Sequence, residues 1–131
     1  MIGLDTNVLV RYLVQDDPAQ AKRASALIDR AAASESAMFI NHVVLCELAW
    51  VLGRGYGYAR AELAELIEKI LLGRQFEIEQ KDLVWAALSD FKASRADFAD
   101  CLIGVTNVLA GCESTLTFDR SAPSLRAFKQ A

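Results

Sequence analysis

The chain has 131 residues, 14 Lys and Arg against 17 Asp and Glu, and a formal net charge of −3. Its 53% of hydrophobic residues and only 2 Pro exclude a disordered, collagen-like or low-complexity chain, and its length predicts a single domain over residues 1–131. The acidic balance disfavours a protein that covers nucleic acid with a uniformly basic surface.

Apolar spacing in the first half of the chain predicts alternating strands and helices. Short apolar runs bounded by polar residues are typical of buried strands, and apolar residues three or four positions apart are typical of helices. Asp17 and Pro18 mark one helix start, because Asp caps helices well and Pro fits the first helical position. In chain order, this half predicts a strand over 2–4, a helix over 8–14, a helix from Pro18, a strand over 38–40 and a helix over 44–52.

The second half of the chain continues this alternation. Gly73 and Gly111 follow helical patterns, as glycines that end helices do. The predicted elements are a helix over 63–71, a strand over 76–79, a helix over 83–91, a helix over 98–110 and a strand over 114–118. Apolar strands that alternate with helices are typical of a parallel sheet covered on both faces, so we predict a small three-layer α/β domain.

Cysteine usage and the lack of targeting segments bear on the compartment. Cys46, Cys101 and Cys112 are an odd number without C-x-x-C spacing, so neither a disulfide framework nor a zinc site is predicted. A reduced chain in the cytoplasm is the simplest interpretation. The first residues do not resemble a signal peptide, and the apolar stretch 43–52 is too short to cross a bilayer. We expect a soluble protein with no membrane partner.

Acidic residues fall where a parallel sheet places its ligands, beyond the carboxyl ends of the strands. Asp5 and Asp119 follow the first and last predicted strands, and Glu47 lies about one turn into the helix after the second strand. Asp97 and Asp100 are three positions apart at a helix start, so they can share a face. We expect these five acids to converge on one rim of the sheet.

A single acid at a helix start is explained by its favourable interaction with the helix dipole. A group of acids around one cleft needs a further explanation. The sequence offers few nearby cations to pair all of them. Carboxylates around one cleft repel each other unless a cation joins them, and Mg²⁺ and Mn²⁺ prefer oxygen ligands. Because such ions activate water and neutralise charge on a phosphodiester, the residues favour metal-dependent phosphodiester hydrolysis.

Four segments of the chain resemble the motifs of PIN-domain ribonucleases. Residues 3–9, Gly-Leu-Asp-Thr-Asn-Val-Leu, are similar to the family's N-terminal motif, and residues 43–48, with Glu47, are similar to its second acidic motif. Residues 97–103, Asp-Phe-Ala-Asp-Cys-Leu-Ile, resemble the third motif, and residues 117–119, Thr-Phe-Asp, resemble the last. The motifs follow the family's order across nearly the whole chain, and its size is similar to that of the VapC toxins of bacterial type II toxin–antitoxin pairs.

The resemblance implies an endoribonuclease that depends on Mg²⁺ or Mn²⁺, with a PIN-like α/β/α fold around a small, mostly parallel sheet. By motif position, the catalytic and metal-binding carboxylates would be Asp5, Glu47, Asp100 and Asp119. Thr6 would support the site beside the first Asp, and Asp97 would be an additional acid that some relatives carry. The implied partners are an RNA substrate, a second copy of the chain and a VapB-type antitoxin whose C-terminal segment blocks the cleft.

Other functions fit parts of the pattern. A haloacid-dehalogenase-like phosphatase also begins with a strand that ends in Asp, but it needs a second Asp two positions later, where this chain has Asn7. A non-catalytic metal-binding or partner-binding α/β module of the receiver type needs a Lys near its last strand, and residues 118–120 contain none. A PIN fold that only supports an assembly would not need all four acidic positions filled.

Three residues outside the acidic set are further candidates for a functional role. His42 is the only His, which leaves no basis for a Ser-His-Asp or two-histidine mechanism and favours a structural role at a strand end. Arg54 and Tyr56, in the glycine-containing segment 53–57, could bind RNA through charge and stacking, although a surface turn is the simpler interpretation.

The five acids of the predicted site also explain the overall charge. Without them, 12 acids remain against 14 Lys and Arg, which is a formal charge of +2 outside the site. The acidic excess is therefore confined to the predicted metal site, and the rest of the surface is compatible with RNA.

Overall fold

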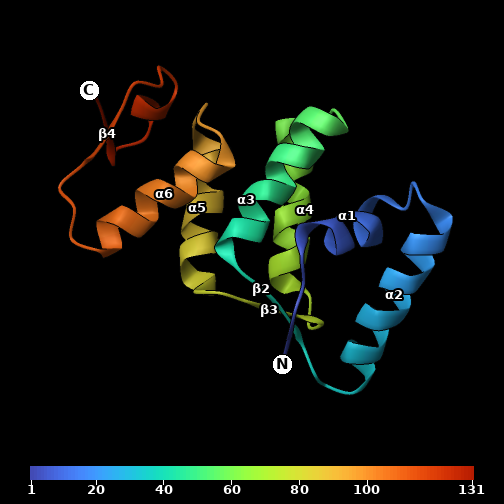
Figure 1. Ribbon diagram of the computed structural model, residues 1–131. Coiled ribbons are helices and arrows are strands. Elements are labelled where there is room, and N and C mark those ends of the chain that lie inside the picture. The colour runs from blue at the N-terminus through green and yellow to red at the C-terminus, as the bar shows by residue number, and fades with distance from the viewer. The chain divides into compact units, whose positions relative to one another are not determined.

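The computed structural model describes residues 1–131, except for the side chain of Ser124. The chain, whose elements Figure 1 labels, divides into two compact units, one formed by residues 1–58 and 69–79 and the other by residues 59–68 and 80–131. Each unit is described by itself. Within the described part of the chain, no helix is both long and apolar enough to cross a lipid bilayer.

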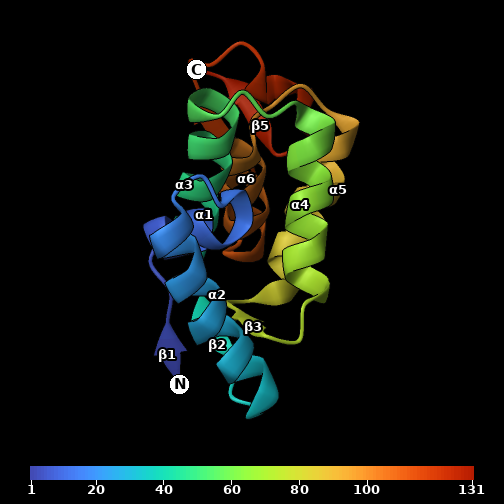
Figure 2. The same cartoon turned by 90° about the vertical axis from the view of Figure 1, so that its right-hand side faces the viewer.

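The first unit contains a three-stranded parallel sheet in the order β1-β2-β3 (Figure 2). Helices connect these strands, as parallel pairing requires. In chain order, the elements are β1 (Ile2–Gly3), α1 (Thr6–Val14), α2 (Pro18–Ala33), β2 (Met38–Ile40), α3 (His42–Trp50), the π-helical turn Val51–Gly55, the last residues of α4 (Arg60–Leu72) and β3 (Phe76–Ile78).

Polar caps fix where the helices of the first unit begin. The carboxylate of Asp5 accepts a hydrogen bond from the backbone nitrogen of Thr6, and the side chain of Asn41 accepts one from Val44. Asn41 directly follows β2, and only Leu4 separates Asp5 from β1, so each strand is followed closely by a helix start. The side chains beneath these starts are fully buried, among them Leu9, Ile28, Ile40, Leu45 and Leu48.

The second unit consists of packed helices and a two-stranded parallel sheet. Helix α5 packs against α6, and β4 pairs with β5. Gly104 of α6 lies against Phe128 of β5, and a Cβ at this glycine would come within 2.8 Å of the Phe128 ring. In chain order, the elements are the first residues of α4, α5 (Lys81–Ala93), α6 (Phe98–Leu109), β4 (Thr115–Thr117), the 3₁₀ turn Ala122–Ser124 and β5 (Phe128–Gln130).

The predicted α/β class, with parallel strands that alternate with helices, is confirmed. Two details of the prediction are wrong. The strand near residues 114–118 does not extend the first sheet, because it pairs instead with β5, a segment too short and too polar to show a strand pattern. The helix predicted over 44–52 also does not end at its predicted boundary, because the π-helical turn Val51–Gly55 continues α3 into the glycine-containing segment 53–57.

Candidate active site

The first unit brings Asp5 and Glu47 together through Thr6. Asp5 ends the chain segment after β1, and Glu47 lies in α3. The backbone nitrogen of Thr6 donates to Asp5 Oδ1 at 2.7 Å, and the Thr6 hydroxyl donates to Glu47 Oε1 at 2.8 Å. Thr6 is buried, whereas both carboxylates are exposed. One buried residue therefore orients two exposed carboxylates that lie 42 residues apart along the chain.

These carboxylates face a hollow of about 450 Å³, here called the carboxylate hollow. Its lining combines two acids with the cation Arg11 and the phenol of Tyr56, which the sequence analysis proposed as an RNA contact. The lining residues are Asp5, Thr6, Asn7, Val10, Arg11, Glu47, Val51 and Tyr56.

Arg11 is a residue of this hollow that the sequence analysis missed. Its Nη1 lies 2.9 Å from Asp16 Oδ1, and its Nε donates to Gln20 Oε1 at 2.7 Å. The Tyr56 hydroxyl donates to Asp16 Oδ2 at 2.7 Å, and this hydrogen bond is the main reason that the pKa of Asp16 is lowered. Helical spacing was the available signal, because Arg11 lies one turn after Asn7 on the same face of α1.

The second unit brings Asp100 together with Asp97 and Asp119. Asp97 caps α6, and its Oδ1 accepts a hydrogen bond from the Asp100 backbone nitrogen at 2.8 Å. Asp119 accepts hydrogen bonds from the backbone nitrogen and hydroxyl of Ser121, and these lower its pKa. Burial, followed by the charges of Asp97 and Asp119, raises the pKa of Asp100 to about 6.

One atom of this second set is unusual. Asp100 Oδ2 is buried, and no described residue forms a hydrogen bond with it. A buried carboxylate oxygen without a donor is costly, and a cation is the partner that relieves both the burial and the repulsion from neighbouring acids. The donors are all carboxylate oxygens, which suit Mg²⁺ or Mn²⁺. The donor atoms of this set therefore suit a hard divalent ion. Within the described residues of either unit, no three His, Cys, Asp or Glu side chains lie close enough together to hold one in this structure.

His42, Arg54 and Cys101 lie outside the two sets of carboxylates. The His42 ring Nε2 lies 2.6 Å from the Glu79 carbonyl oxygen, and the His42 backbone nitrogen donates to the Glu79 carboxylate, which supports the structural interpretation. Arg54 is exposed in the π-helical turn and does not line the carboxylate hollow. Burial raises the pKa of the Cys101 thiol to about 11, so this cysteine is protonated at neutral pH.

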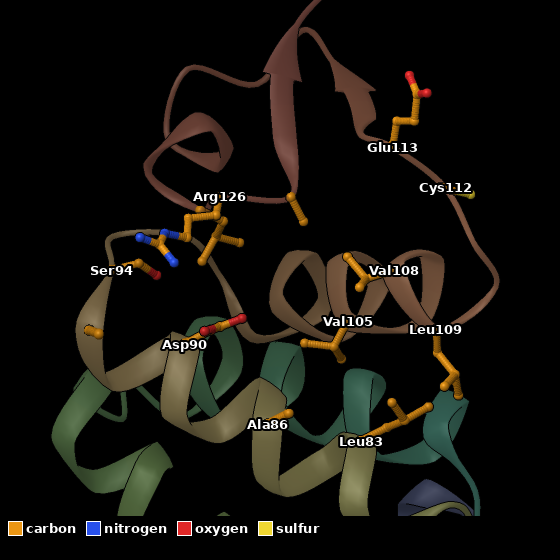
Figure 3. A pocket seen from close by; sticks show the side chains of 13 residues that line it. Leu83, Ala86, Asp90, Ser94, Val105, Val108, Leu109, Cys112, Glu113 and Arg126 are labelled. Carbon is orange, nitrogen blue, oxygen red and sulfur yellow. The ribbon is translucent and has the colours of Figure 1, made fainter.

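The second unit also contains a hollow of about 720 Å³ whose lining includes none of the predicted site residues (Figure 3). Leu83 and Ala86 from α5 and Val105 and Val108 from α6 give it a mainly apolar lining. It offers two acids, Asp90 and Glu113, and one Arg at its edge. Because its lining brings no set of carboxylates together, this hollow does not support the hydrolytic chemistry.

Comparisons with known proteins agree with the motifs. The family model described as PIN domain matches residues 2–127. The chain is similar to the VapC ribonuclease of Aquifex aeolicus (strain VF5), with 26% identity over 117 residues that cover 89% of this chain and 86% of the relative. No solved structure gives a significant match. The α/β/α class predicted from the alternation of strands and helices is consistent with the matching family.

Proposed function

The chain belongs to the PIN domain family, and from this premise we propose that it is a metal-dependent endoribonuclease of the VapC type that hydrolyses phosphodiester bonds in RNA. The observation that supports the metal dependence is the buried Asp100 Oδ2. No described residue donates a hydrogen bond to it, and the charges of Asp97 and Asp119 act on the same carboxylate. Similarity to a VapC ribonuclease supports RNA as the substrate. The family match leaves the phosphatase alternative without support.

In this proposal Asp5, Glu47, Asp100 and Asp119 hold Mg²⁺ or Mn²⁺ and carry catalysis. The bound ion supplies activation of a water molecule and neutralisation of the charge that develops on the phosphodiester. Thr6 fixes one oxygen of Asp5 and one oxygen of Glu47 through its hydrogen bonds, which leaves the other oxygen of each for a ligand. Asp97 caps α6 and thereby holds the start of the helix that carries Asp100.

The proposal extends to partners. We expect a homodimer that a VapB-type antitoxin inhibits in the cytoplasm, because the relative is a VapC ribonuclease. Val43 and Trp50, seven positions apart on α3, are 68% and 65% exposed and offer an apolar surface to a protein partner. Arg54 and Tyr56 are proposed RNA contacts, and Tyr56 is the one that lines the carboxylate hollow.

The test is cleavage of RNA by the purified, antitoxin-free protein. We expect cleavage in Mg²⁺ or Mn²⁺, loss of cleavage in EDTA, and recovery when the metal is returned. Asp5→Asn and Asp100→Asn should each abolish cleavage while circular dichroism stays unchanged. Undiminished cleavage by both variants would contradict the assignment of the site, and cleavage that persists in EDTA would contradict the metal dependence.

A further inference from the structure

A second hollow in the first unit adjoins the carboxylate hollow. It has a volume of about 410 Å³, lies between α1 and α2, and is here called the arginine hollow. Asn7 and Arg11 line both hollows, so the two hollows adjoin along α1. The lining residues of the arginine hollow are Asn7, Val8, Arg11, Gln20, Arg23, Ala24 and Leu27.

The charge changes sign between the two hollows. The carboxylate hollow presents Asp5 and Glu47, whereas the residues that line the arginine hollow include Arg11 and Arg23 and no acid. Helices α1 and α2, which carry these arginines, pack against each other (Figures 1 and 2). We propose that the RNA strand next to the bond that is cleaved follows the arginine hollow and that Arg11 and Arg23 bind its phosphates. This inference rests on the proposed function.

Hydrogen bonds orient the Arg11 side chain before a phosphate binds. Its Nε donates to Gln20 and its Nη1 to Asp16, so the guanidinium is fixed in direction before RNA arrives. A fixed guanidinium loses less side-chain freedom when it binds a phosphate. Asp16 offsets part of the Arg11 charge.

Arg23 supplies positive charge that is not offset in this way. It is exposed on α2, and it makes no ion pair with any residue that the structure describes. A guanidinium can bind a phosphate through two parallel hydrogen bonds. Val8, Ala24 and Leu27 give the same hollow apolar surface, which can contact the sugar or the face of a base. Charge together with apolar surface is the combination that single-stranded RNA requires.

The substrate is favoured over a protein partner because the arginine hollow adjoins the carboxylates. A phosphodiester that reaches the carboxylates carries further phosphates along the same strand, and those phosphates need cations beside the site. An acidic protein segment would gain from Arg23 but would be repelled by Asp5 and Glu47.

The test compares Arg23→Gln with Lys22→Gln, which removes the same charge from the neighbouring position of α2 but does not line either hollow. Binding of a labelled single-stranded oligoribonucleotide is measured in EDTA over a range of salt concentrations, so that it does not depend on cleavage. For Arg23→Gln we expect about fivefold weaker binding and a salt-dependence slope that is smaller by about 0.7. Lys22→Gln should match the wild type.

Cleavage supplies a second measurement. In Mg²⁺ or Mn²⁺, Arg23→Gln should raise KM about fivefold and leave kcat unchanged, because Arg23 binds the strand and not the reacting phosphate. Arg11→Gln should show the same change. It is measured together with a thermal melt, because this variant also removes the hydrogen bonds to Asp16 and Gln20.

The outcomes separate this inference from the proposed function. Equal RNA affinity, salt slope and KM for wild type, Arg23→Gln and Lys22→Gln would overturn the inference even if the wild type cleaves RNA. If Arg23→Gln weakens only the complex with an antitoxin, the arginine hollow is a protein-docking surface and the inference is wrong. Binding that depends on Arg23 in a wild type that cleaves no RNA would support the inference and contradict the proposed endoribonuclease.

Discussion

The carboxylates of the two units are held in different ways. In the first unit, Asp5 and Glu47 are exposed, and each accepts a hydrogen bond from Thr6. In the second unit, Asp100 lies beside two further acids, its pKa is raised by burial and by their charges, and its Oδ2 has no hydrogen-bond donor among the described residues. Thr6 stabilises both carboxylates of the first pair, whereas Asp100 in the second set has an oxygen that only a bound cation would stabilise.

This difference indicates which part of the site the chain maintains at a cost to its stability. An exposed carboxylate that accepts a hydrogen bond lowers the stability of the fold little, because water hydrates the carboxylate oxygen that the hydrogen bond does not use. A buried oxygen with acidic neighbours costs more, and such costs are typical of functional sites. Asp100 is therefore the carboxylate whose replacement should separate stability from activity most clearly.

The largest expected effect is that of Asp100→Asn. Loss of a metal-binding carboxylate should reduce cleavage by about a thousandfold or more. In EDTA the same variant should have a higher free energy of unfolding than the wild type, because it removes a charge that burial and two acids disfavour. Added Mg²⁺ should stabilise the wild type, by about 2.7 kcal/mol at a hundred times the dissociation constant, and should stabilise the variant much less. Urea denaturation with and without metal measures both effects.

Asp90→Asn is the matched control, because Asp90 is an acid of the same unit that lines the apolar hollow of Figure 3. It should keep both the cleavage rate and the response to Mg²⁺. If Asp100→Asn were less stable than the wild type in EDTA and responded equally to Mg²⁺, the contrast between the two carboxylate sets would be wrong.

Local sequence patterns predicted most of the fold. The strand over 38–40 was predicted with its observed bounds, because a short apolar run there is followed by the capping residue Asn41. Asp17 and Pro18 begin α2 as predicted. The partner of β4 could not be predicted, because β5 has only three residues, two of them polar and exposed, and its pairing depends on packing such as that of Phe128 against Gly104.

The sequence predicted which residues belong to the candidate site, but it did not predict the contacts between them. The acids were found because they follow strands or begin helices, and Thr6 came from the motif resemblance. The hydrogen bond from Thr6 to Glu47 spans 41 residues, so no local pattern shows it. Arg11 was missed because its role depends on α2, which supplies Gln20, and on Tyr56, a residue 45 positions away. The orphaned oxygen of Asp100 is likewise visible only in three dimensions.

A smaller effect is expected for Thr6→Val, which tests how the first carboxylate pair is held. Val has nearly the shape of Thr and fits the buried position, but it cannot donate to Glu47. Cleavage should fall about 10- to 100-fold, as for residues that orient metal ligands. The free energy of unfolding should fall by only about 1 kcal/mol. Thr6→Ser keeps the hydroxyl and should restore cleavage. A stability loss without any loss of cleavage would show that Thr6 does not orient Glu47.

The smallest effect is expected for Tyr56→Phe, which removes the hydrogen bond to Asp16 at the edge of the carboxylate hollow. That hydrogen bond lowers the pKa of Asp16 in the folded state, so it contributes stability above the pKa of the unfolded chain and loses it as the pH falls through the folded pKa. Thermal melts should therefore show a slightly lower Tm for the variant at pH 7 and a difference that disappears towards pH 2. The response to Mg²⁺ should equal that of the wild type, because the Arg11–Asp16–Tyr56 network is satisfied without a metal. A Tm difference that stays constant with pH would mean that packing of the ring, and not the hydrogen bond, stabilises this edge of the hollow.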